Sequence, residues 1–178
     1  FIRHGNKTII AHVAGVQNIE AYTLRDRGRP KRDSRVGMLP PKLAQIIINL
    51  AVGSKPLKKG YSVLDPFCGT GVVLQEALLM GYPVHGSDID QRMVSYTDDN
   101  LDWLRQQYPQ AWEVMPQGVS LGDATSTQWE YTRFTFDDEH EATDERIVPL
   151  EIGAVACEGY LGTPFASEPP EGALRDSI

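Results

Sequence analysis

The pattern of apolar and polar positions predicts short buried strands that alternate with helices. The predicted strands are residues 61–65, 83–89, 118–125 and 152–162, and the predicted helices between them are residues 72–80 and 91–108. The second helix carries apolar or small residues at helical spacing, namely Met93, Thr97, Leu101, Leu104 and Tyr108. Strands that alternate with helices form βαβ units, so the sequence predicts the α/β class with a parallel sheet.

Upstream of residue 61 the pattern is less regular. Residues 7–16 read as one strand, and residues 40–52 as an amphipathic helix. Pro40 and Pro41 suit the start of that helix. Its expected buried face is Leu43, Ile46, Ile47, Leu50 and Ala51. Residues 126–151 are acidic and weakly periodic, which fits either a hairpin or a loop insertion.

Composition limits the possibilities. The 178 residues suffice for one domain with a sizeable core, and no apolar run approaches the roughly 20 residues that cross a bilayer. The chain does not begin with Met, so we expect a fragment of a longer protein. Cys68 and Cys157 are too few for a disulfide framework and are expected as reduced thiols in the cytoplasm. The four histidines lack metal-ligand spacing, so no metal is expected.

Charge is distributed unevenly within a net charge of -7. Residues 1–60 hold 12 Lys and Arg against 3 Asp and Glu, whereas the remainder holds 5 against 21. The densest basic segment, residues 25–35, is predicted as a loop. It is either a solvated loop or a surface that binds RNA phosphates. The candidate RNA-binding residues are Arg25, Arg27, Arg29, Lys31, Arg32 and Arg35.

A glycine loop follows the first predicted strand, in the stretch "DPFCGTG". A phosphate-binding P-loop would need Lys after Gly71, and a dinucleotide fingerprint would need a third Gly at position 74. Asp65 would also repel a pyrophosphate. S-adenosyl-L-methionine has a cationic end and no phosphate, and it fits this loop better.

Each predicted strand ends near an acid: Asp65, Asp88, Asp123 and Glu158. In parallel sheets ligands bind outside the carboxyl ends of the strands, so these carboxylates are expected to converge. Asp65 can hold the amino-acid end of the cofactor. Asp88 can accept both ribose hydroxyls, and Asp123 can accept from the adenine amine. Ile89 and Ala124 can line the adenine faces.

The stretches "GMLPPKLAQIIINLA", "DPFCGTGVVLQEALLMGYPVHGSDID" and "GDAT" resemble Rossmann-fold S-adenosylmethionine-dependent methyltransferases. Within that class they resemble the tRNA guanosine-N2 family that modifies guanine 10. The resemblance implies a Rossmann-like class I sheet with helices on both faces. It assigns residues 1–24 to a connector or the tail of an upstream RNA-binding domain, and residues 25–178 to a methyltransferase domain whose C-terminal strands are missing. The cofactor positions that it implies are Met38, Leu39, Pro40, Asp65, Phe67, Cys68, Gly69, Gly71, Asp88, Ile89, Asp123 and Ala124.

Amino-methyltransferases of this fold place an acid or amide, two prolines and an aromatic residue after the fourth strand. This chain has "ACEGYLG" there, so Glu158 is the candidate hydrogen-bond acceptor for a target amine, and Tyr160 the candidate that stacks on a base. The expected reaction is methylation of the exocyclic N2 amine of a guanosine in tRNA. A DNA adenine-N6 methyltransferase, or a relative that binds cofactor or RNA without turnover, remains open.

Overall fold

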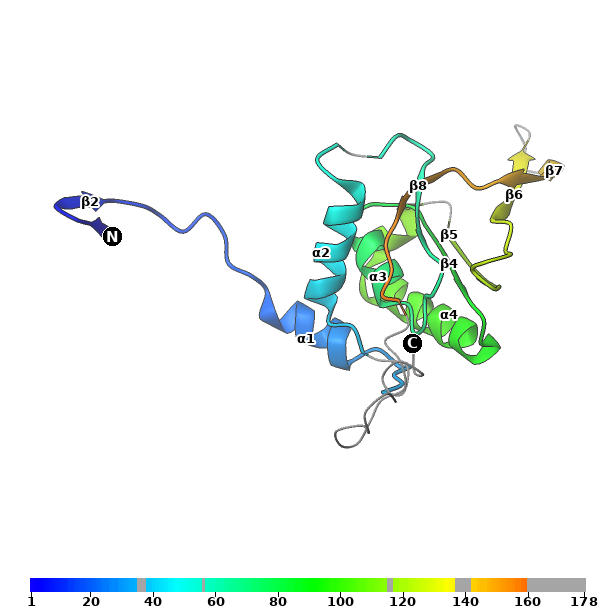
Figure 1. Cartoon of the computed structure of the whole chain (residues 1–178), viewed down its shortest axis with the longest axis horizontal. Coiled ribbons are helices and arrows are strands. Elements are labelled where there is room, and N and C mark those ends of the chain that lie inside the picture. Colours follow the sequence, from blue (N-terminus) through cyan, green and yellow to red (C-terminus); the bar gives the residue numbers. More distant parts are fainter. Residues whose placement is uncertain (35–37, 56, 115–116, 137–141, 160–178) are drawn as a thin grey trace, which may run out of the picture.

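The computed structural model describes residues 1–34, 38–55, 57–114, 117–136 and 142–159 (Figure 1). Its centre is a parallel four-stranded sheet in the order β5-β4-β3-β8. The strands are β3 (Ser62–Asp65), β4 (Val84–Asp88), β5 (Gln117–Leu121) and β8 (Ile152–Val155). The predicted parallel sheet and its four strands are confirmed. The chain runs from β3 outward to β5 and then returns to the other side of β3, so the topological switch point lies between β3 and β8.

Three helices pack beside one another against this sheet. They are α2 (Pro41–Val52), α3 (Val72–Leu79) and α4 (Gln91–Gln107), which is followed by the short 3-10 helix η1 (Pro109–Glu113). α3 lies between α2 and α4 and contacts both β3 and β4. Every residue from Val72 to Leu78 is buried, because a helix surrounded by sheet and helices has no solvent-facing side. The predicted buried positions of α4 are confirmed: Met93, Thr97, Leu101 and Leu104 are at most 2% exposed.

The buried face of α2 differs from the prediction. The helix buries Pro41, Ala44 and Ile48, whereas Leu43, Ile46 and Leu50 are 43%, 47% and 78% exposed. The segment is apolar at most positions, so two faces satisfy helical periodicity equally well. Contact with α3 and β8 selects the face with the small Ala44.

The N-terminal part of the chain corrects two further predictions. Residues 7–16 are not one strand, because β1 (Ile2–His4) and β2 (Lys7–Ile9) form an antiparallel hairpin about Gly5. Helix α1 (Ile19–Arg27) then begins at Asn18, whose side chain accepts a hydrogen bond from the Ala21 N–H. The first residues of the predicted basic loop therefore belong to a helix. The hairpin extends away from the body of the domain (Figure 1), and all of residues 1–20 are exposed.

The acidic segment between β5 and β8 forms a hairpin of β6 (Glu130–Phe136) and β7 (Ala142–Pro149). This outcome settles the choice between a hairpin and an irregular loop. Within the described ranges, none of the helices combines the length and the apolarity that a bilayer span requires.

Candidate active site

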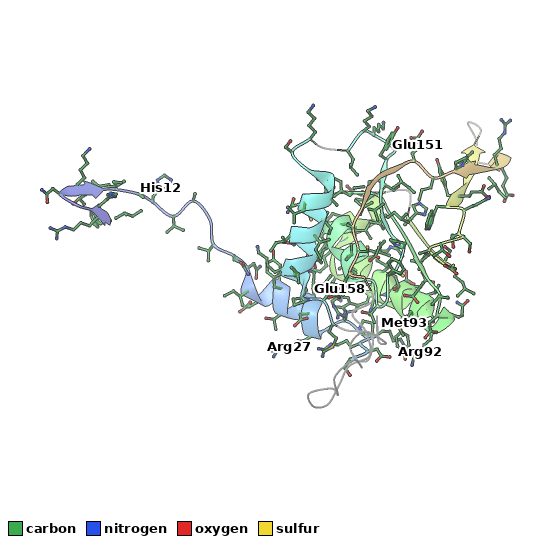
Figure 2. The ribbon with its side chains drawn as sticks, viewed as in Figure 1. His12, Arg27, Arg92, Met93, Glu151 and Glu158 are labelled. Atoms are coloured by element: carbon green, nitrogen blue, oxygen red, sulfur yellow. The ribbon has the colours of Figure 1, made fainter. Side chains whose placement is uncertain are left out.

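The four predicted acids lie at the carboxyl end of the sheet. Asp65 and Asp88 are the last residues of β3 and β4, Asp123 follows β5 by two residues, and Glu158 follows β8 by three. Figure 2 shows Glu158 at the end of the sheet where Arg92 and Met93 begin α4, while Glu151 lies at the opposite end. Parallel pairing places the four positions along one edge, as the alternation of strands and helices predicted.

The glycine loop between β3 and α3 is held by backbone hydrogen bonds. The Cys68 N–H donates to the Ser87 carbonyl at 2.9 Å, and the Gly71 N–H donates to the Cys68 carbonyl at 2.7 Å. Gly71 has a φ of +79°, and a Cβ there would lie 2.7 Å from Cγ2 of Thr97. Glycine is therefore required at this position for both its conformation and its size.

Asp88 ties the glycine loop to the end of β4. Its Oδ2 accepts from the Gly69 N–H and its Oδ1 accepts from the Asp90 N–H, both at 2.9 Å. A carboxylate offers about four acceptor positions. About two acceptor positions of Asp88 therefore remain for hydroxyl groups such as those of a ribose.

Asp65 is a buried carboxyl group, 2% exposed. Burial raises its pKa to about 7, and the negative charges of Asp88 and Glu158 add to the rise, whereas a hydrogen bond from the Phe67 N–H at 3.1 Å opposes it. Asp65 and Asp88 end adjacent parallel strands, and Glu158 follows the strand on the other side of β3, so the three acids gather at one end of the sheet. Such a site favours a ligand that brings positive charge.

Glu158 is half-buried beyond the end of β8. The register of β8 on β3 continues past the strand, because the Ala156 N–H donates to the Leu64 carbonyl at 2.9 Å. The adjacent Cys157 thiol has a raised pKa, owing to burial and then to the charge of Asp65. This segment therefore lies beside β3. Tyr160 lies outside the described residues.

Asp123 occupies a different setting, in an exposed turn. Its Oδ1 accepts from the N–H and the hydroxyl of Thr125, at 2.8 and 2.7 Å. These hydrogen bonds lower the pKa of Asp123. The structure thus places Asp123 at the expected edge but not in the buried acid group around Asp65.

The apolar residues predicted to line the cofactor fall into two groups. Met38, Phe67 and Ile89 are 42%, 51% and 74% exposed, and Phe67 and Ile89 directly follow the carboxyl ends of β3 and β4. Leu39 and Cys68 instead belong to the core, and burial raises the pKa of the Cys68 thiol to about 12. Pro40 is the N-cap of α2, and Ala124 is half-buried.

Two polar residues of α4 support the loop and were missed as site residues by the sequence analysis. The Thr97 hydroxyl donates to the Gly69 carbonyl, and the Asn100 side-chain amide donates to the Thr70 carbonyl, both at 2.8 Å. Both side chains are fully buried on the otherwise apolar face of α4. The sequence did contain a signal for this role, because Thr97 and Asn100 are polar residues at helix positions that the periodicity predicts to be buried, and buried polar groups need hydrogen-bond partners.

The six basic candidates are in unlike environments. Arg25 is buried and bound to Glu76, and Arg29 is 3% exposed. Lys31 is half-buried and pairs with Asp99 at 3.2 Å, whereas Arg27 and Arg32 are exposed. Arg35 lies outside the described residues. Of the described candidates, only Arg27, Lys31 and Arg32 can reach a ligand on the surface without rearrangement.

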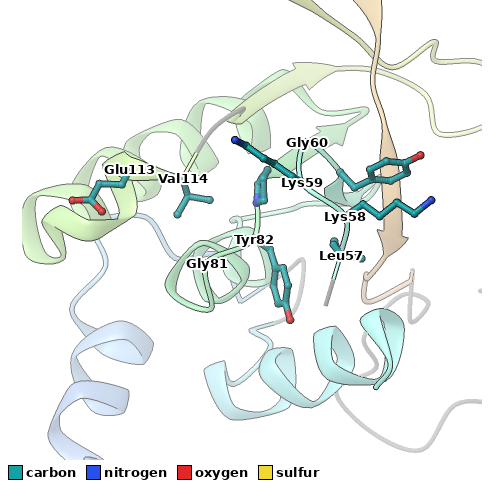
Figure 3. A pocket seen from close by; sticks show the side chains of 10 residues that line it. Leu57, Lys58, Lys59, Gly60, Gly81, Tyr82, Glu113 and Val114 are labelled. Carbon is teal, nitrogen blue, oxygen red and sulfur yellow. The ribbon is translucent and has the colours of Figure 1, made fainter. Parts of the chain in front are cut away.

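A pocket of about 350 Å³ lies at the other end of the sheet (Figure 3). Lys58, Lys59 and Tyr61 line it from the segment that leads into β3, and Tyr82 lines it from the segment that leads into β4. These segments precede the strands, so the pocket is remote from the carboxyl edge and from the acids. It is not the site described above.

The parallel sheet with its switch point beside β3, the glycine loop and the acid that ends β4 together define a Rossmann-like α/β fold. Residues 29–116 match UPF0020, the RMKL-like methyltransferase domain. That match spans just under half of the chain, and the chain is also similar to proteins named tRNA (guanine(10)-N2)-dimethyltransferase.

Two of the curated relatives with that name show the extent of the similarity. The protein from Methanothermobacter thermautotrophicus is 52% identical over 65 residues, which cover 36% of this chain and 18% of the relative. The protein from Methanocaldococcus jannaschii is 41% identical over 97 residues, which cover 54% and 26%. The chain thus spans about a fifth to a quarter of the length of these relatives. A solved structure of a candidate RNA methyltransferase from Pyrococcus horikoshii is 22% identical with a TM-score of 0.42, over 60% of this chain and 52% of that one.

Proposed function

We propose that the domain binds S-adenosyl-L-methionine at the carboxyl ends of β3, β4 and β8. The observation that carries this proposal is the position of Asp65, Asp88 and Glu158 at one end of the sheet, around the glycine loop that Asp88 binds through the Gly69 N–H. Asp88 has acceptor positions for ribose hydroxyls, and the buried Asp65 favours a cationic amino-acid end. The exposed Phe67 and Ile89 offer apolar surface for the adenine, and Asp123 is suited to its amine.

The proposed reaction is methylation of the exocyclic N2 amine of a guanosine in tRNA. The cofactor, when bound, supplies an electrophilic methyl group. Glu158 accepts a hydrogen bond from the target amine, which orients the nitrogen lone pair, and it can take up the proton that the methylated amine loses. The two archaeal relatives are named tRNA (guanine(10)-N2)-dimethyltransferases, which supports the choice of a tRNA guanosine as substrate.

The surface that the proposal assigns to RNA is the exposed part of the basic segment. Arg27, Lys31 and Arg32 supply positive charge next to the loop that leads into α2. Contacts of this kind bind phosphates without reading sequence. The free Cys68 is in keeping with a reducing compartment, and a cytoplasmic location is part of the proposal.

Two measurements test the cofactor and the substrate separately. Titration calorimetry with S-adenosylhomocysteine should show binding at one site, and no heat of binding would remove the cofactor proposal. Labelled methyl transfer to tRNA should exceed transfer to duplex DNA. Equal or greater labelling of DNA adenine would instead favour the DNA enzyme.

A pair of variants tests the catalytic assignment. Glu158→Ala should abolish methyl transfer and affect cofactor binding far less, because the acid contacts the target amine and no hydrogen bond to the cofactor is assigned to it. Glu151→Ala is the matched control, since this exposed acid precedes β8 at the opposite end of the sheet. Methyl transfer that survives in Glu158→Ala would contradict the assignment.

A further inference from the structure

Arg29 is a buried cation for which the described part of the chain provides no hydrogen-bond acceptor. The residue is 3% exposed, and Nε and both terminal guanidinium nitrogens are buried without a hydrogen-bond partner. Guanidinium groups are almost never found in this condition, because an unpaired buried charge costs several kcal/mol. The arrangement therefore points to an anion that is supplied from outside the chain.

The nearest acids are already engaged or poorly placed. Both carboxylate oxygens of Glu76 accept from Arg25, at 2.5 and 3.2 Å, and Oε2 also accepts from the Gln45 amide at 2.7 Å. Asp26 influences Arg29 electrostatically but makes no hydrogen bond with it. Burial, together with the charge of Arg32, lowers the pKa of Arg29 despite the opposing effect of these two acids. The described side chains thus leave Arg29 without compensation.

The segment that carries Arg29 is attached to the glycine loop. Two residues further on, the Lys31 N–H donates to Oδ1 of Asn100, and the Lys31 carbonyl accepts from Nδ2 of the same side chain, both at 2.9 Å. Nδ2 of Asn100 also donates to the Thr70 carbonyl in the loop. The backbone two residues beyond Arg29 is therefore held close to the start of α3, and the charge of Glu76 on the same helix acts on the Arg29 guanidinium. The backbone N–H groups at the start of that helix also favour an anion.

We propose that Arg29 binds the carboxylate at the amino-acid end of S-adenosyl-L-methionine. This inference rests on the proposed cofactor. That cofactor carries one carboxylate, which Asp65, Asp88 and Glu158 would repel, so it needs a cation inside an otherwise acidic site. A guanidinium matches a carboxylate with two parallel hydrogen bonds.

The test compares two ligands that differ only in the carboxylate: S-adenosyl-L-methionine and decarboxylated S-adenosylmethionine. Titration calorimetry on the whole chain should show that the wild type prefers the carboxylated ligand. Arg29→Gln should weaken its binding about 10- to 100-fold, the range expected for hydrogen bonds to a charged group, and should leave the decarboxylated ligand unchanged. Arg27→Gln is the matched control on the exposed surface and should change neither affinity.

Two results would overturn the assignment. One is an equal loss for both ligands in Arg29→Gln, which would mark a purely structural role, and the other is no change for either. Arg29→Lys retains the charge and should keep part of the preference for the carboxylated ligand. If the Gln variant folds poorly, the ratio of the affinities for the two ligands can therefore still be measured in the Lys variant. Failure of the wild type to bind either ligand would reject the proposed function, and the assignment of Arg29 with it.

Discussion

Replacement of Asp65 by Asn, combined with a pH titration, tests the electrostatics of the site most directly. The raised pKa of about 7 means that the folded, unliganded protein holds this carboxyl largely protonated below neutral pH. A cationic ligand favours the ionised carboxylate. Binding should therefore release a proton near neutral pH, and affinity should rise as the pH rises toward 7.

The magnitude follows from the ionised fraction. With a pKa of about 7, that fraction rises from about 0.03 at pH 5.5 to about 0.5 at pH 7, so the affinity for S-adenosylhomocysteine should rise about fifteenfold. This range lies below the usual α-amino pKa of about 8, so the ligand stays protonated. Calorimetry in two buffers of different ionisation enthalpy measures both the affinity and the proton release.

The unliganded protein gives a second, independent readout. A carboxyl group whose folded pKa lies above its unfolded value of 3.8 binds its proton more tightly in the folded state. Its contribution to stability is therefore greatest at low pH and declines between about pH 4 and pH 7. The unfolding temperature of the wild type should therefore fall relative to that of Asp65→Asn as the pH rises over that interval. A flat affinity profile in the wild type, or the same slope in both proteins, would refute the reasoning.

Two further predictions concern stability and are measured by thermal or urea unfolding. Gly71→Ala should destabilise the fold more than Gly69→Ala, because both have positive φ but only the Cβ at position 71 would meet Thr97, at 2.7 Å; equal losses would show that the loop adjusts freely. Leu74→Ala should cost about 2–5 kcal/mol, since Leu74 is fully buried, whereas Leu50→Ala, at a position 78% exposed, should change stability by less than about 0.5 kcal/mol. A comparable loss in the two Leu variants would contradict the described core.

The sequence by itself determined the order of the elements from β3 to α4 and the position of the glycine loop. Strand and helix periods are local properties, so β3, α3, β4 and α4 could be read from short windows. The placement of Asp65 and Asp88 at one edge followed from parallel topology alone, because strands of the same direction end on the same side.

Only the tertiary structure decided which charges are buried and which faces are covered. The pairing of Arg25 with Glu76 joins residues 51 positions apart, and no local pattern in the basic segment distinguishes it from its exposed neighbour Arg27. The buried face of α2 was likewise chosen by α3 and β8, because its sequence satisfies two faces equally. The raised pKa of Asp65 has the same origin, since desolvation depends on residues that fold around a group from distant parts of the chain.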